Sequence, residues 1–159
     1  MEMNMNELDL TKLPGWQEAE ESTRRRIVEG AKRYIQQQND LDYEWIGTNE
    51  YNLSTLGCCK AFQLLLKESS GFLETLLPET WRKWAPIIIA THHSHHESWY
   101  LEIVKFTYTN APEESIDTLI KLIDGGDYLF LDCFDRCWDD RIQSALLKKI
   151  KEPECKLQC

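Results

Sequence analysis

Four histidines form the part of this chain closest to a metal-binding pattern: His92, His93, His95 and His96, followed directly by Glu97. Zinc in proteins takes three or four nitrogen, sulfur or oxygen donors arranged as a tetrahedron. Adjacent side chains point apart, but His92 can share one helical face with His95 or His96. A small metal-dependent enzyme built on this segment is one interpretation. We favour the other, a polar loop between two helices, and expect no metal or cofactor to be bound.

Six cysteines offer thiol chemistry, and their spacing indicates packing instead. Cys133 and Cys137 stand four residues apart on one predicted helix, and Cys155 and Cys159 repeat that spacing near the end of the chain. This is the spacing of one helix face, not the C-x₂-C of a zinc knuckle. Disulfide frameworks are typical of small secreted chains with poor cores, whereas 42% of this chain is hydrophobic. We therefore predict reduced thiols, with the first pair in the core and the second exposed.

Charged clusters are the remaining candidates. In the run Arg24, Arg25 and Arg26, the first two follow glutamates at i, i+4 spacing, which predicts the pairs Glu20–Arg24 and Glu21–Arg25, with Glu29–Arg33 further along the same solvated helix. A site for phosphate or for an acidic partner is the alternative. A second cluster is acidic and has arginines beside it but no calcium-loop glycine, so we interpret it as internally paired. Its members are Asp132, Asp135, Asp139 and Asp140, with Arg136 and Arg141.

Composition and missing motifs exclude several functions. The net charge of −9 and the isoelectric point near 4.9 argue against nucleic acid and anionic membranes as partners. No P-loop, G-x-S-x-G, H-E-x-x-H or G-x-G-x-x-G pattern occurs. We therefore predict that the chain is not an enzyme and has no catalytic, cofactor-binding or metal-binding residue.

Residues 78–90 are the stretch around which the other elements are expected to pack. Trp81 and Trp84 lie three residues apart on one side of a helical turn, and the positions after Pro86 are apolar on every side. A helix that is apolar all round is usually buried. The pattern predicts a central helix, kinked at Pro86, with other helices against both of its sides.

Helical periodicity and Pro/Gly punctuation extend through most of the chain and predict an all-α fold. We expect antiparallel helical hairpins, arranged either as a HEAT-like solenoid or as an irregular bundle. The predicted division is a flexible lead-in over 1–15, one helical repeat domain over 16–152, and a flexible tail over 153–159. The predicted helices are 17–38, 54–67, a short turn at 72–76, 78–90, 97–109, a helix ending at Gly125, a short one containing Cys133 and Cys137, and one ending at Pro153.

Particular side chains are assigned within these elements. Tyr43, Trp45 and Tyr51, in the polar loop 39–52, are expected to lie against the body of the protein, with a ligand groove as the alternative. Asn110 is a candidate N-cap, because Glu113 follows it three residues later. The inward faces of two helices are predicted to be Trp99, Ile103 and Phe106, and Ile142, Ala145, Leu146 and Ile150.

The N-terminal residues lack the basic and apolar regions of a signal peptide, and no apolar run approaches the length of a bilayer span. We therefore expect a cytoplasmic location.

Several segments resemble a helical region of large cyanobacterial NACHT-type signalling ATPases of the STAND class. The most specific is 72–89, around Trp-Arg-Lys-Trp-Ala-Pro at 81–86, and another is 131–149, around Phe-Asp-Arg-Cys-Trp-Asp-Asp-Arg at 134–141. Further matches are 13–16 with 23–34, 45–48, 57–66 and 100–124. The resemblance implies a sensor or scaffold arm that acts in signalling, including defence, by binding protein. Because this chain lacks the P-loop, the implied partner is a separately encoded NACHT ATPase module or a trigger protein, and no ATPase residue carries over.

Overall fold

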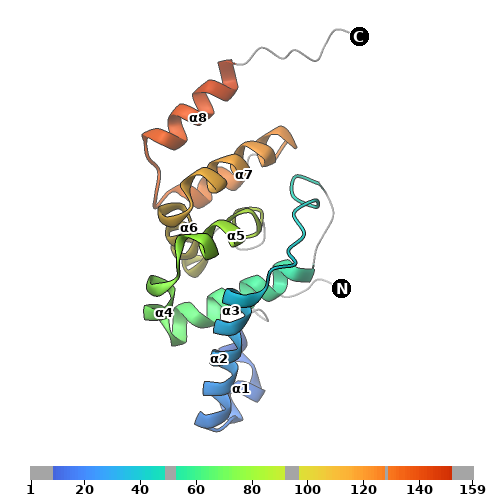
Figure 1. Cartoon of the computed structure of the whole chain (residues 1–159), viewed down its shortest axis with the longest axis vertical. Helices are drawn as coiled ribbons and strands as arrows, with labels where there is room; N and C mark the ends of the chain where they lie inside the picture. Colours follow the sequence, from blue (N-terminus) through green and yellow to red (C-terminus); the bar gives the residue numbers. More distant parts are fainter. Residues whose placement is uncertain (1–8, 49–52, 92–96, 128, 152–159) are drawn as a thin grey trace.

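The computed structural model describes residues 9–48, 53–91, 97–127 and 129–151. Within these ranges the chain forms eight α-helices and two short 3-10 helices, with no strand, which confirms the all-α prediction. The helices succeed one another along the long axis of the molecule, with α1 and α2 at one end and α8 at the other (Figure 1). No described helix is long and apolar enough to cross a membrane.

The first two helices differ from the single helix predicted over 17–38. The 3-10 helix η2 (Leu10–Lys12) and α1 (Pro14–Glu18) already form within and beside the predicted lead-in, and α2 (Glu21–Gln37) begins after a break. The break lies at Ala19, whose backbone is extended. Arg24 joins the two helices, because its guanidinium donates to the carbonyls of Trp16 (2.8 Å) and Gln17 (2.7 Å).

The helices in the middle of the chain follow the sequence pattern closely. They are α3 (Leu53–Glu68), α4 (Ser70–Thr75), α5 (Pro78–Ile89), α6 (Ser98–Asn110) and α7 (Pro112–Asp124). Pro78 occupies the first turn of α5, where its missing N–H costs no helical hydrogen bond. The helix also runs through Pro86 without ending there. The Asn110 cap prediction is wrong: Asn110 is the last residue of α6, and Ala111 separates α6 from α7.

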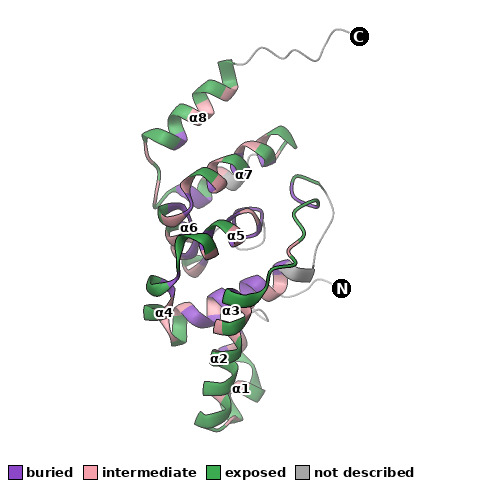
Figure 2. Cartoon of the chain, viewed as in Figure 1, coloured by how far each residue is buried: buried purple, intermediate pink, exposed green. Residues whose placement is uncertain are grey.

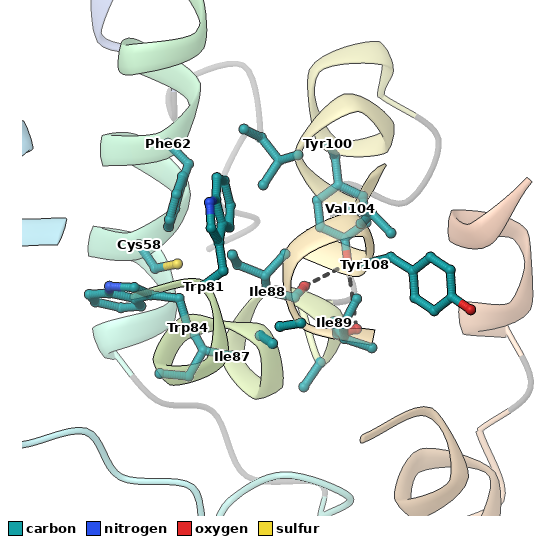
Figure 3. Close-up of a cluster of buried hydrophobic side chains, with 14 of the residues drawn as sticks. Cys58, Phe62, Trp81, Trp84, Ile87, Ile88, Ile89, Tyr100, Val104 and Tyr108 are labelled. Carbon is teal, nitrogen blue, oxygen red and sulfur yellow. Dashed lines mark hydrogen bonds between the residues drawn. The ribbon is translucent and has the colours of Figure 1, made fainter. Parts of the chain in front are cut away.

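Most of helix α5 is buried, as its composition predicts, while Pro78, Glu79 and Arg82 are exposed. An exposure of at most 3% is found at Trp81, Trp84, Ala85 and the isoleucines at 87–89. Helix α5 packs against α3, α6 and α7. Figure 3 shows the resulting core, in which Phe62 of α3 faces both tryptophans while Tyr100 of α6 reaches the α5 backbone. The Tyr100 hydroxyl donates to the Ile88 carbonyl at 2.7 Å, so the buried phenol is satisfied.

The polar loop after α2 lies against the same body. Trp45 is 9% exposed, and the Tyr43 hydroxyl donates to the Lys83 carbonyl at 2.8 Å, while Tyr51 lies outside the described residues. Gly47 has φ +81, a left-handed conformation that favours glycine. Its carbonyl oxygen would lie 2.9 Å from a Cβ placed on Gly125, so the loop approaches the end of α7 too closely for a side chain there.

The C-terminal part of the molecule consists of the 3-10 helix η4 (Leu129–Phe134) and α8 (Asp140–Lys151). Phe134 and Cys133 are fully buried beside α6, whereas α8 packs mainly on α7. Helix α8 is consequently exposed over most of its surface (Figure 2).

Candidate interaction surface

The histidine segment cannot be placed in a site. His92, His93, His95 and His96 lie outside the described residues, so both interpretations of that segment stay predictions. Glu97 beside them is described, and its carboxylate accepts a hydrogen bond from the Trp99 indole at 2.9 Å. Among the described residues, no group of three or more His, Cys, Asp or Glu side chains is placed to hold a metal ion.

The described thiols lie in apolar surroundings that favour the neutral form. Burial raises the pKa of Cys59 to about 11 and the pKa values of Cys58 and Cys133 well above their usual range. Cys133 is fully buried, as predicted, but Cys137 is half-buried and follows the end of η4, so the two do not share a helix. A nucleophilic cysteine needs a lowered pKa, so these thiols fit structural roles.

This arrangement predicts a graded pattern of thiol labelling. At about pH 8, a maleimide should modify Cys137 of the native protein faster than Cys58, Cys59 or Cys133, because it reacts with accessible thiolates. Mass spectrometry of peptides from native and denatured samples measures the pattern, and the denatured sample serves as the control for full reactivity. Rapid native labelling of Cys133 would contradict its position in the core.

The acidic cluster is used to attach α8. The Tyr108 hydroxyl donates to Asp139 Oδ1 at 2.6 Å, the Arg141 guanidinium pairs with Asp139 Oδ2 at 3.1 Å, and the Ile142 N–H donates to Oδ1 at 3.1 Å. Asp139 thereby caps α8 and ties it to α6. Asp132, Asp135 and Asp140 are exposed, and Arg136 pairs with Glu102 at 3.2 Å instead of with the cluster. The prediction of internal pairing therefore holds for Asp139 with Arg141 alone among the described contacts.

We expect the stability contribution of Asp139 to depend on pH. The hydrogen bond from Tyr108 is the largest influence that lowers the pKa of Asp139 below its usual 3.8, and the Ile142 N–H and Arg141 lower it further. The charged form therefore stabilises the fold above the unfolded pKa, and this contribution is lost as the pH falls through the folded pKa.

The variant Asp139→Asn isolates this charge, because asparagine is also a good N-cap. The melting temperature of the wild type should exceed that of the variant at neutral pH, and the gap should close as the pH falls below about 4. Circular dichroism at a series of pH values measures the gap. A gap that stays constant from neutral to acid pH would show that the Asp139 charge does not act on folding.

Two arginines of the run, Arg24 and Arg25, make contacts within the fold. Arg24 is fixed to α1 and lies over the Trp16 ring at 5.7 Å. Arg25 pairs with Glu21 at 3.2 Å, as predicted, whereas Glu29 pairs with Lys32 at 2.8 Å in place of the predicted partner. Both pairs include exposed groups and so contribute little to stability. Nothing in these contacts adds support to a phosphate site.

Helix α8 presents an apolar surface that the periodicity analysis assigned wrongly. Ile142 is fully buried, and Ala145 and Leu146 are half-buried as predicted, but Ile150 is 78% exposed. Lys149 occupies the inward position instead, and its ammonium pairs with Asp124 of α7 at 2.8 Å. A lysine stem can cover apolar surface while its charge reaches a partner. Ile150 is therefore turned away from the α7 contact.

We define the α8 outer face as Gln143, Leu147, Lys148, Ile150 and Lys151. All five side chains are exposed, and Leu147 is 46% exposed. Leu147 and Ile150 stand three residues apart and therefore lie on one side of the helix. Sequence reasoning missed this face because it assigned Ile150 to the core and did not consider a second apolar side; the pair Leu147 and Ile150 was the available signal.

Comparisons of the chain with protein-family models, with curated proteins and with solved structures found no match.

Proposed function

We propose that this chain is a non-enzymatic helical domain that binds another protein. The observation that carries the proposal is the α8 outer face, where Leu147 and Ile150 are exposed on a helix with no covering element among the described residues. Exposed apolar side chains on one side of a helix are suited to protein recognition. The buried thiols and the ion pairs described above, in contrast, are accounted for by folding.

The resemblance to the arm of NACHT-type ATPases gives the proposal its finer form. In this form the helices are HEAT-like hairpins of a sensor or scaffold, the setting is cytoplasmic signalling, and the partner is a separately encoded ATPase module or a trigger protein. The succession of helices along the long axis supports an array of this kind (Figure 1). The net charge of −9 disfavours nucleic acid as the partner.

Affinity purification of the tagged full chain from its native cells tests this function. We expect a protein to be recovered in about equimolar amount and to be retained in the presence of a metal chelator. The Leu147→Asp/Ile150→Asp variant serves as a second bait. Recovery of no protein above the background of an unrelated acidic helical bait would contradict the proposed function.

A further inference from the structure

Helix α8 has two apolar sides, and the fold uses one of them. Ile142, Ala145, Leu146 and Lys149 follow the i, i+3, i+4, i+7 spacing and form the contact with α7. Leu147 and Ile150 are displaced around the helix from this set and are 46% and 78% exposed. An outer helix with a single apolar stripe would be fully satisfied by α7. A helix that packs against a neighbour on each side needs a second apolar stripe.

The spacing of Leu147 and Ile150 indicates which shape of partner fits the α8 outer face. Side chains three residues apart on a helix form part of a ridge, and another amphipathic helix with apolar residues at i, i+3 and i+4 can pack against that ridge. Figure 1 shows α8 at the end of the molecule, with open space on the side away from α7. A partner helix can therefore lie along α8 without displacing any described element.

Charge indicates the chemistry of that partner. Residues 141–151 contain four basic side chains and no acidic one, in a chain whose net charge is −9. Arg141 and Lys149 are engaged with Asp139 and Asp124, which leaves Lys148 and Lys151 exposed beside the apolar stripe. Lysines in the last turn of a helix also interact favourably with the helix dipole, but this interaction does not explain why Leu147 and Ile150 are exposed.

The same charges disfavour the symmetric pairing of two copies through α8. Pairing of two α8 helices would bring Lys148 and Lys151 of each copy close to one another, and like charges placed together disfavour association.

We propose that the α8 outer face binds an amphipathic helix of a partner protein whose apolar stripe is flanked by aspartate or glutamate. This inference rests on the proposed function and adds the position of the contact and the class of ligand. The apolar stripe supplies the contact area, and the lysines select acidic flanks and reject basic ones.

A labelled synthetic helix of about 14 residues, or roughly four turns, is a suitable probe. It carries leucines at i, i+3, i+4 and i+7 and glutamates on both flanks, and a second peptide has lysines in place of the glutamates. Fluorescence anisotropy with the full chain should show binding of the acidic helix and at least roughly tenfold weaker binding of the basic one. Added salt should weaken the acidic complex.

The Leu147→Asp/Ile150→Asp variant should reduce binding of the acidic peptide by at least about tenfold, because both contact positions are removed. Ile27→Asp is the matched control: Ile27 is 40% exposed on α2, at the other end of the molecule, and its replacement should leave binding unchanged. Circular dichroism verifies that both variants are folded.

Four outcomes would overturn the inference. They are equal affinity for the two peptides, no binding of the acidic peptide up to about 1 mM, unchanged peptide binding by the α8 variant, and equal losses of affinity in the α8 and control variants.

Sedimentation of the chain alone tests whether a second copy occupies the α8 outer face, and self-association that the α8 variant abolishes would identify that occupant. Binding to phosphatidylserine vesicles that depends on Leu147 and Ile150 would identify a membrane instead. If a native partner is recovered equally by the wild type and the α8 variant, the inference fails while the proposed function stands.

Discussion

Replacing Trp84 by alanine should destabilise the protein by about 3–5 kcal/mol, the usual cost of truncating a buried aromatic side chain. Trp84 is fully buried, and its indole N–H donates to the Ile35 carbonyl of α2 at 2.8 Å. Its ring also lies 5.3 Å from that of Tyr34, so one side chain joins α5 to α2 by packing and by a hydrogen bond. The variant therefore creates a cavity and removes the partner of a carbonyl.

Chemical denaturation followed by circular dichroism measures this loss as a change in the free energy of unfolding. The control is Trp138→Ala, because Trp138 is 46% exposed and its removal should change stability by about 0.5 kcal/mol or less. A loss below about 1 kcal/mol for Trp84→Ala would mean that the core does not depend on this tryptophan.

The Phe62→Ala variant is expected to have an effect of similar size, about 3–5 kcal/mol. Phe62 is 1% exposed and contacts both tryptophans of α5, stacking on Trp81 with centroids 5.5 Å apart and meeting Trp84 edge-on at 6.1 Å. Aromatic pairs in these arrangements add to the stabilisation that comes from burial alone. Phe62 is thus the main aromatic link from α3 to α5.

A matched control exists on the other face of Trp81. Phe106 of α6 also stacks on Trp81, at 5.8 Å and 5°, but it is only half-buried, so Phe106→Ala should cost clearly less. A double-mutant cycle of Phe62→Ala with Trp84→Ala should give a coupling of at least about 0.5 kcal/mol, because the two rings touch. Equal losses for Phe62→Ala and Phe106→Ala, or additivity in the cycle, would contradict the predicted packing.

The sequence predicted the buried centre well because that part of the fold depends on local pattern. Tryptophans three residues apart and a run of isoleucines make most of α5 apolar, so the burial of these residues follows from composition. The ends of α3, α6 and α7 also agree with prediction within a few residues, because proline, glycine and changes in periodicity mark them.

Predictions failed where long-range contacts decide the structure. The helix breaks at Ala19, and Arg24 bonds back across the break to α1, a contact that periodicity does not reveal. Thr107 and Ser115, both fully buried, were missed because only apolar residues were assigned to the core. Each hydroxyl donates to a carbonyl four residues earlier, at 2.7 Å, and so enters the interior without an unmet hydrogen bond.

The α8 outer face was missed for a related reason. By position, Ile150 and Lys149 fit the inward stripe of α8 equally well. The apolar side chain of Ile150 makes it the one expected to face α7. In the structure Lys149 faces α7 and its ammonium pairs with Asp124, whereas Ile150 stays exposed. Which of these two neighbouring positions faces α7 depends on the packing of separate helices, and it cannot be derived from the sequence of either helix alone.

We propose that this chain acts by binding protein and not through a metal site. The measurement that decides between the two is the amount of native partner that the full chain recovers, compared between the wild type and a variant with His92, His93, His95 and His96 all replaced by glutamine. We expect equimolar recovery of the partner by both proteins, with no effect of a chelator on recovery or on the melting temperature. Failure of both to recover a partner, together with about one zinc per wild-type chain that is lost in the variant, would contradict this proposal.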